Sequence, residues 1–166
     1  MGGKDKIKHV VMQINKNFKP ILMTVKDIPQ IIEIYKSFWG TSGLYNISSF
    51  IKIIKQNLSF ALKIENEIIG FCLMDYCPNT KIIEIALLCI KEEYKGHNLG
   101  NYLLSYSINY CRDIKLKKFT LHVSTTNIPA IALYTKLGFK VIEVIKNYYH
   151  DEDPTNNNAY FMFLNN

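Results

Sequence analysis

The chain has 166 residues, of which 48% are hydrophobic and 20% charged, so it is long enough for one well-packed domain and too short for two. Its 20 Lys and Arg residues outnumber its 14 Asp and Glu residues, and the net charge of +6 suits an anionic partner such as a nucleotide, an acidic peptide or the ribosome surface. Lysine supplies almost all of the positive charge, whereas proteins that read base edges usually use arginine, so we expect no specific binding of nucleic acid.

The four cysteines show neither a CxxC spacing nor a nearby pair of histidines. We expect reduced side chains that pack in the interior: Cys72, Cys77, Cys89 and Cys111. No apolar run approaches the roughly 18 residues of a membrane span, and the N-terminus lacks the layout of a secretory signal. The expectation is therefore a cytoplasmic protein with no membrane attachment.

Residues 1–18 are expected to form a polar N-terminal extension, and residues 19–166 a single domain. This domain begins with an expected strand at 19–25. Two helices follow, in which apolar residues recur every three or four positions, at 28–38 and 47–54. Three strands separated by short polar turns come next, a pattern typical of an antiparallel meander, at 59–64, 68–76 and 81–90.

A helix then runs from a glycine-containing turn at 95–100 to about Arg112, and the remaining pattern is strand, helix, strand, strand. Asn127 as a cap, Pro129 in the first turn and Gly138 after the last turn delimit the second helix. These four elements are expected at 118–124, 128–137, 139–145 and 158–164. The sequence thus predicts one α/β (α+β) domain, with a mixed, mostly antiparallel central sheet flanked by about four helices.

The turn Lys95-Gly96-His97-Asn98-Leu99-Gly100 opens a helix with two glycines, and no Ser, Thr or Asp stands ready there as a cap. Such a turn exposes several backbone N–H groups at the positive end of the helix dipole. It therefore predicts a phosphate site in a strand–turn–helix unit near the middle of the sheet.

The order of elements, with a turn of the form Arg/Gln-x-x-Gly-x-Gly/Ala before this helix, resembles the GNAT superfamily of acetyl-CoA-dependent N-acetyltransferases. Lys95 is a conservative substitute for Arg or Gln, Gly100 matches, and Asn98 stands where the family usually has glycine. Asparagine tolerates a left-handed backbone better than most residues. The resemblance implies acetyl-CoA as co-substrate, bound by Leu88, Cys89, Ile90, Lys95, Gly96, His97, Asn98, Leu99, Gly100, Asn101, Asn127 and Tyr134.

The run LHVSTTNIPAIALYTKLGFKVIEVIKNYY, residues 121–149, is similar to the corresponding run of protein N-terminal acetyltransferases. These include the bacterial ribosomal-protein alanine acetyltransferases and the eukaryotic type that acetylates hydrophobic methionine-starting N-termini. The similarity implies transfer of an acetyl group to the α-amino group of protein or peptide N-termini. The similarity also implies an auxiliary subunit and the ribosome as partners.

Glu84 interrupts the apolar run KIIEIALLCI, where a lone carboxylate costs free energy unless it is partnered or faces a wet cleft. Its separation from Gly100 equals that of the catalytic glutamate in the histone-acetylating branch of the superfamily, which implies a general base. The alternative is a structural carboxylate that caps backbone amides or pairs with a lysine.

His122 shares a strand face with Thr120 and Ser124, and a polar face in a central strand suggests a cleft. In the eukaryotic enzymes that the chain resembles, a histidine here is a general base that acts through water; a structural histidine is the alternative. Tyr134 matches the family tyrosine that protonates the departing thiolate, although its helical spacing also fits a core aromatic.

Phe38 opens the stretch 38–46, where the family has its peptide-binding loop, and is expected to contact the substrate. Tyr148 and Tyr149 are expected to line the peptide slot, or else to form an aromatic pair at a strand end. We expect no metal site, because the other histidines show no ligand spacing: His9, His97 and His150.

Other functions stay open on the sequence. Acetylation of an internal lysine or a small amine is one, because of Glu84, and a non-catalytic acetyl-CoA-binding subunit is another, because of Asn98. A nucleic-acid-binding module ranks last, since the aromatic residues follow core periodicities.

Overall fold

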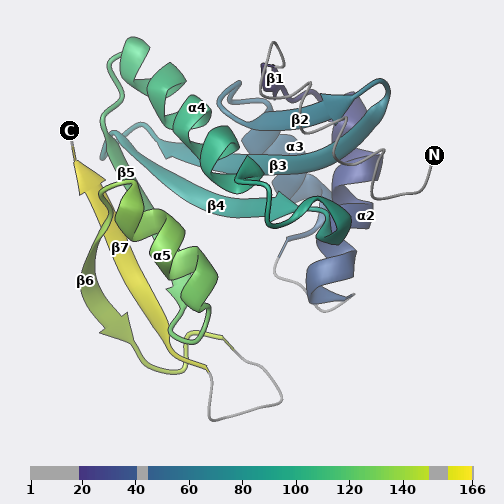
Figure 1. Ribbon diagram of the computed structural model, residues 1–166. Helices are drawn as coiled ribbons and strands as arrows, with labels where there is room; N and C mark the ends of the chain where they lie inside the picture. Colours follow the sequence, from purple (N-terminus) through teal and green to yellow (C-terminus); the bar gives the residue numbers. More distant parts are fainter. Residues whose placement is uncertain (1–18, 41–44, 150–156, 166) are drawn as a thin grey trace.

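The computed structural model describes residues 19–40, 45–149 and 157–165, so the expected N-terminal extension, His9 and His150 lie outside it. Seven strands form one sheet in the order β1-β2-β3-β4-β5-β7-β6 (Figure 1). The strands are β1 (Ile21–Leu22), β2 (Phe60–Ile64), β3 (Glu67–Cys77), β4 (Ile82–Ile90), β5 (Lys118–Ser124), β6 (Lys140–Ile145) and β7 (Ala159–Asn165). Only the pairing of β4 with β5 is parallel.

Four α-helices and two short 3-10 turns complete the described part of the chain. They are η1 (Val25–Asp27), α2 (Ile28–Trp39), α3 (Ile47–Ile54), η2 (Glu92–Tyr94), α4 (Leu99–Asp113) and α5 (Ile128–Lys136). The expected α/β domain, with a mixed, mostly antiparallel sheet and four helices, is confirmed.

The first strand is shorter than expected. The sequence predicts a strand over 19–25, but β1 contains only Ile21 and Leu22, because η1 begins at Val25. Thr24 ends the extended segment: its backbone N–H and its hydroxyl both donate to the Asp27 carboxylate, at 2.8 and 3.0 Å. These bonds turn the chain from the sheet edge into α2.

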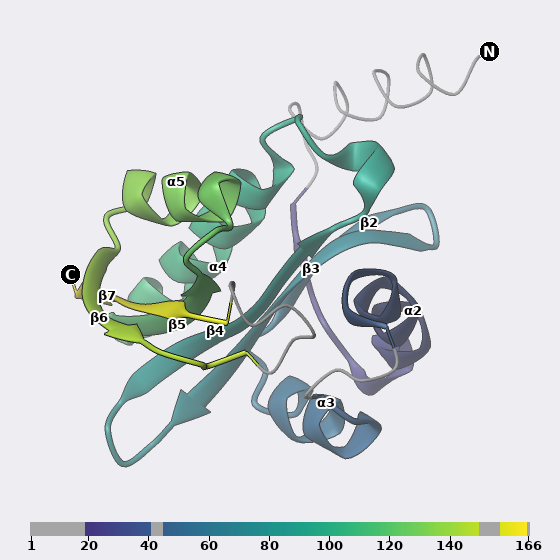
Figure 2. The same cartoon turned by 90° about the horizontal axis from the view of Figure 1, so that it is seen from below.

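The helices cover the two faces of the sheet unequally. Figure 2 shows α4 and α5 on one face, while α2 and α3 lie on the other face beneath the half formed by β2, β3 and β4. Alternation along the strands feeds a separate core on each face: Phe71 and Leu73 of β3 pack with α2 and α3, whereas Phe119 and Leu121 of β5 pack with α4. On the α2/α3 side, no helix of the described segments lies under β5, β7 and β6 (Figure 2).

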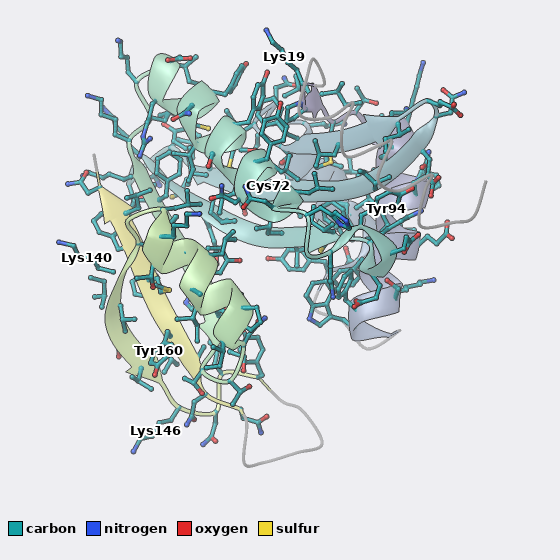
Figure 3. All side chains as sticks on the ribbon, in the orientation of Figure 1. Lys19, Cys72, Tyr94, Lys140, Lys146 and Tyr160 are labelled. Atoms are coloured by element: carbon teal, nitrogen blue, oxygen red, sulfur yellow. The ribbon has the colours of Figure 1, made fainter. Side chains whose placement is uncertain are left out.

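Three of the four cysteines are buried as expected, and the prediction is wrong for Cys77. Cys72 lies on β3 beneath α4 (Figure 3), and Cys89 and Cys111 are likewise buried. Cys77, the last residue of β3, is exposed because the strand there leaves the core and enters the turn to β4. No helix in the described residues is long and apolar enough to cross a membrane.

We predict that a thiol reagent modifies Cys77 first in the folded protein. Its thiol is exposed, and hydrogen bonding with Thr80 lowers its pKa, so more of it is thiolate at neutral pH. Burial raises the pKa values of Cys72, Cys89 and Cys111. Time-resolved absorbance with an aromatic disulfide reagent should show one fast thiol, which is lost in Cys77→Ser. Two or more fast thiols in the wild type would contradict this burial pattern.

Alkaline pH should destabilise the fold through the buried thiols. Burial raises the pKa of Cys72 and of Cys111 from 9.0 to about 12, so the unfolded chain loses these protons first. Their contribution is therefore fully present below pH 9 and is lost as the pH rises toward 12. Urea unfolding at pH 8 and at pH 10.5 should show the loss, and Cys111→Ala should reduce it. An equal loss in Cys111→Ala would exclude the thiol as its source.

Candidate active site

The only parallel pair in the sheet ends after three residue pairs. Ile82, Ile83 and Glu84 of β4 stand opposite Lys118, Phe119 and Thr120 of β5, and no further residues pair. Beyond that point β4 stays with β3, while β5 stays with β7 to its end at Ser124. The peptide groups of β4 that point toward β5 beyond Glu84 therefore have no strand partner.

The ladder of β3 and β4 determines which peptide groups face this open edge. The Lys91 N–H donates to the Ile69 carbonyl at 2.9 Å, and pairs two residues away along an antiparallel ladder repeat that arrangement. Cys89 therefore directs its N–H and C=O toward β3, whereas Leu88 and Ile90 direct theirs to the open edge. Three residues of β4 are expected to bind acetyl-CoA, and two of them, Leu88 and Ile90, present their backbone to the gap.

A β-bulge accompanies the parting of the strands. The register changes from Leu73 opposite Leu87 to Met74 opposite Ile85, so Ala86 is the additional residue on β4. Side chains before the bulge, Ile83 and Ile85, join the core under α4, and those after it, Leu87 and Cys89, join the core over α2 and α3. A bulge of this kind bends its strand, which turns the end of β4 away from β5.

The turn before α4 has the expected open form. Gly96 and Asn98 both have left-handed backbones, with φ of 77° and 61°, and the side chain of Asn98 makes no capping hydrogen bond. The first N–H groups of a 15-residue helix thus stay available at its positive end. Asn101 lies in the first turn of α4, and its Oδ1 is buried with no hydrogen-bond partner in the described residues. The site fits the pyrophosphate and pantetheine amides of a coenzyme A molecule.

Lys95 and Phe38 meet beside this turn. The Lys95 ammonium lies 4.7 Å from the centroid of the Phe38 ring and also pairs with Glu92. Phe38 comes from the last turn of α2, so the residue expected to contact the substrate lies next to the phosphate turn. His97 is held in the same turn, with Nδ1 3.3 Å from the Tyr94 carbonyl oxygen.

Glu84 and His122 are in contact at the point where the strands part. Glu84 Oε1 lies 3.1 Å from His122 Nδ1, and the side chains are 41% and 21% exposed. The contact follows from the register, because Thr120 stands opposite Glu84 and His122 is two residues further along the same face of β5. Two residues that the sequence offers as separate candidates therefore form one pair.

Aromatic rings enclose the imidazole of His122. The Tyr148 ring stacks on it almost parallel, at 4.5 Å and 11°, and the Phe161 ring lies 5.1 Å away at 34°. Tyr149 packs edge-on against Tyr148 at 4.9 Å. Burial raises the pKa of Tyr148, with Glu84 adding to the effect, and burial and Tyr148 raise the pKa of Tyr149 to about 12. Both hydroxyls are therefore neutral at physiological pH.

Tyr134 is buried on the opposite face of the sheet. It lies on α5, is 8% exposed and packs edge-on against Phe139 at 5.9 Å. Burial raises its pKa, and the thiols of Cys72 and Cys89 add to the shift, so the hydroxyl keeps its proton. Asn127 caps α5 as expected, because its side-chain oxygen accepts the Ala130 N–H at 3.2 Å.

A cavity of about 580 Å³ adjoins the pair on the α2/α3 side. Its walls come from α3, from the turn between β3 and β4, and from the uncovered face of β5 and β7; they include Lys52, Gln56, Asp75, Glu84, Thr120 and Phe161. A second molecule can therefore reach Glu84 from the side opposite α4 and α5. The described residues contain no group of three metal-ligating side chains.

Sequence reasoning missed Tyr45 and Phe161. Tyr45 follows α2, and its pKa is raised by burial first and then by Glu84 and Tyr148, which places it among these groups. Its backbone N–H bonds the Tyr35 hydroxyl at 3.2 Å, a tertiary contact that no local pattern reveals. Alternation in the last strand could have identified Phe161, because its side chain points to the face of the sheet away from that of its buried neighbour Met162.

Asn98→Val should weaken both folding and coenzyme A binding. A β-branched residue at φ 61° costs about 1 to 2 kcal/mol, whereas glycine fits that backbone without strain. Urea unfolding and calorimetric titration should show lower stability and a raised Kd for Asn98→Val, with Asn98→Gly close to wild type in Kd. An unchanged Kd in a folded Asn98→Val protein would mean that the left-handed turn is not needed for binding.

Comparison with known proteins agrees with this geometry. A protein of Bacillus subtilis named as a ribosomal protein bS18-alanine N-acetyltransferase is 31% identical over 132 residues, which cover 78% of this chain and 85% of that protein. An N-alpha-acetyltransferase of Sulfolobus acidocaldarius is 28% identical over 162 residues, covering 88% and 91%.

Among solved structures, Arabidopsis thaliana Naa50 in complex with the bisubstrate analogue CoA-Ac-MVNAL superposes with a TM-score of 0.74. The superposition covers 87% of this chain and 96% of that one, and at 21% identity it supports the fold. The family model described as acetyltransferase (GNAT) family matches residues 28–139. The co-substrate of this family is acetyl-CoA, and the parted strands, the open turn and the family match together show that the chain belongs to the GNAT acetyltransferase family.

Proposed function

We propose that this enzyme transfers the acetyl group of acetyl-CoA to the α-amino group of protein N-termini in the cytoplasm. The observation that carries the proposal is the Glu84–His122 pair, located where the only parallel strand pair of the sheet ends. The names of the relatives support the choice of acceptor, since one is named as an N-alpha-acetyltransferase and the other as a ribosomal protein alanine N-acetyltransferase.

His122 is the general base in this mechanism, and Glu84 orients it. A carboxylate only accepts hydrogen bonds, so the contact at 3.1 Å requires a hydrogen on His122 Nδ1. The lone pair is then on Nε2, which can take a proton from the acceptor amine, directly or through one water. Glu84 also stabilises the imidazolium that forms, as a carboxylate beside a base does in other enzymes.

An N-terminal acceptor demands little of this base. An α-amine with a pKa near 8 is already neutral in roughly a tenth of the molecules at pH 7, whereas a lysine side chain near 10.4 is neutral in less than about one in a thousand. Holding the neutral amine against the acetyl carbon supplies much of the rate enhancement, because it turns a bimolecular step into an effectively unimolecular one.

Tyr134 completes the proton balance. The amine nitrogen bonds to the acetyl carbon and gives a proton to His122, while the carbon–sulfur bond breaks and the sulfur takes a proton from the Tyr134 hydroxyl. The raised pKa of Tyr134 keeps that proton in place until the sulfur becomes basic. Exchange with solvent then restores both groups.

Binding of acetyl-CoA is assigned to the open edge and the turn. Leu88 and Ile90 offer peptide groups to the pantetheine and acetyl oxygens, beside Cys89, and the segment 95–101 offers N–H groups to the pyrophosphate. Asn127 lies at the N-terminus of α5, on the same side of the gap. On the opposite side, Tyr148 and Tyr149 line the approach of the peptide. Docking to an auxiliary subunit or to the ribosome would bring nascent chains to this face.

A second candidate acceptor is an internal lysine or a small amine, favoured by a carboxylate at Glu84. Thiol release from acetyl-CoA should distinguish the acceptors when peptides beginning Met-Leu, Ser or Ala are compared with an N-blocked lysine peptide. We expect turnover on free N-termini. Turnover confined to the blocked lysine peptide would replace the proposed function with the second candidate.

The active-site variants should separate the three roles. His122→Ala is expected to lower kcat about 100-fold, and Glu84→Gln about tenfold, because the amide can orient the imidazole without offsetting its charge. Tyr134→Phe should lower kcat about tenfold, and in the wild type Tyr134 should cause no loss of rate up to pH 10, since its pKa is raised above the ordinary value of 10.0. Lys140→Ala, at an exposed position of β6 outside the cavity, serves as a folding control. Unchanged kcat in His122→Ala would exclude the proposed base.

A further inference from the structure

Tyr148 stands out among the residues around the reaction centre, because the face of its half-buried ring lies against His122. The two rings are 4.5 Å apart and inclined by 11°, a face-to-face arrangement over a residue that is itself largely buried. A tyrosine that served only to contact a peptide would need its hydroxyl free and would not need this stack.

The segment that presents Tyr148 is fixed on both sides. Asn147 has a left-handed backbone, with φ of 52°, and its N–H donates to the Asn158 side chain at 3.1 Å. The Tyr149 N–H donates to the Asn157 carbonyl at 2.9 Å. A left-handed asparagine costs free energy that these bonds help to offset, and the result is a turn that holds the Tyr148 ring over the imidazole.

The bond from Glu84 does not by itself fix the imidazole. It constrains one ring nitrogen, while the torsion about the bond from Cβ to the ring is broad, so the ring can rotate and take Nδ1 away from Glu84. Phe161 lies at 34° to the ring and limits it on one side. The parallel Tyr148 ring opposes rotation of the imidazole out of the stack and thereby keeps Nδ1 on Glu84 and Nε2 toward the acceptor.

We propose that the ring of Tyr148, independently of its hydroxyl, is a positioning residue that holds His122 in the single orientation and tautomer that the reaction uses. The stack also favours the imidazolium formed on proton transfer, because an aromatic face attracts a cation. The expected effect on kcat rests on the proposed function, whereas the expected tautomer of His122 does not.

Two variants separate the ring from the hydroxyl: Tyr148→Phe keeps the stack and removes the hydroxyl, and Tyr148→Leu removes both. In protein with ¹⁵N-labelled histidines at pH 8, the His122 signal is assigned by its loss in His122→Gln. Wild type and Tyr148→Phe should show the Nδ1–H tautomer alone, and Tyr148→Leu a mixture with Nε2–H. On a free N-terminal peptide, Tyr148→Leu should lower kcat about tenfold relative to Tyr148→Phe, with the KM values of the two variants within about twofold of each other.

Tyr148→Met repeats the test if circular dichroism shows that the leucine variant does not fold. Tyr110→Leu, on α4 against Phe60, is the matched control for loss of a partly buried tyrosine. A single Nδ1–H tautomer in Tyr148→Leu would overturn the proposal. A raised KM with unchanged kcat in both Tyr148→Phe and Tyr148→Leu would also overturn it, in favour of a peptide contact through the hydroxyl. Absence of turnover in the wild type would reject the proposed function and leave the tautomer measurement to decide this inference.

Discussion

The end of the pairing between β4 and β5 is the constraint on which the rest of the site depends. Parallel strands that continued side by side would bond the peptide groups of Leu88 and Ile90 to β5 and would leave no backbone for a ligand. The bulge at Ala86 bends β4 away, while β5 keeps β7 along its other edge. One irregularity therefore produces both the opening between the strands and the free N–H and C=O groups that line it.

The two faces of the sheet then supply different chemistry to this opening. On the side of α4 and α5, Tyr134 is buried and neutral, in surroundings that disfavour charge. On the other side, β5, β7 and β6 are not covered by a described helix, and the Glu84 carboxylate and the His122 imidazole meet there in partial contact with water. In the proposed mechanism, the proton donor and the proton acceptor thus lie on opposite sides of one sheet.

Local patterns in the sequence predict the elements well but not their contacts. Alternation in KFTLHVS is enough to place His122 with Thr120, and the preference of asparagine for left-handed backbones is enough to explain Asn98. The contact of Glu84 with His122 requires the register between β4 and β5, which is determined by the packing of the α4 crossover and not by either strand. The position of Tyr45 requires the packing of α2 against α3. Cys77 was misassigned because the prediction treated the four cysteines alike, although Cys77 follows the expected strand 68–76 and lies where β3 leaves the core.

The junction of three residue pairs between β4 and β5 also has a mechanical consequence. On one side of it the sheet is a continuous antiparallel unit of β1 to β4, and on the other β5, β7 and β6 form a second unit with its own ladders. Few backbone hydrogen bonds resist a change in angle between the two units, whereas many resist deformation inside each. The two halves of the sheet are therefore held to each other by the side chains of the core that they share under α4, and by only three residue pairs of backbone.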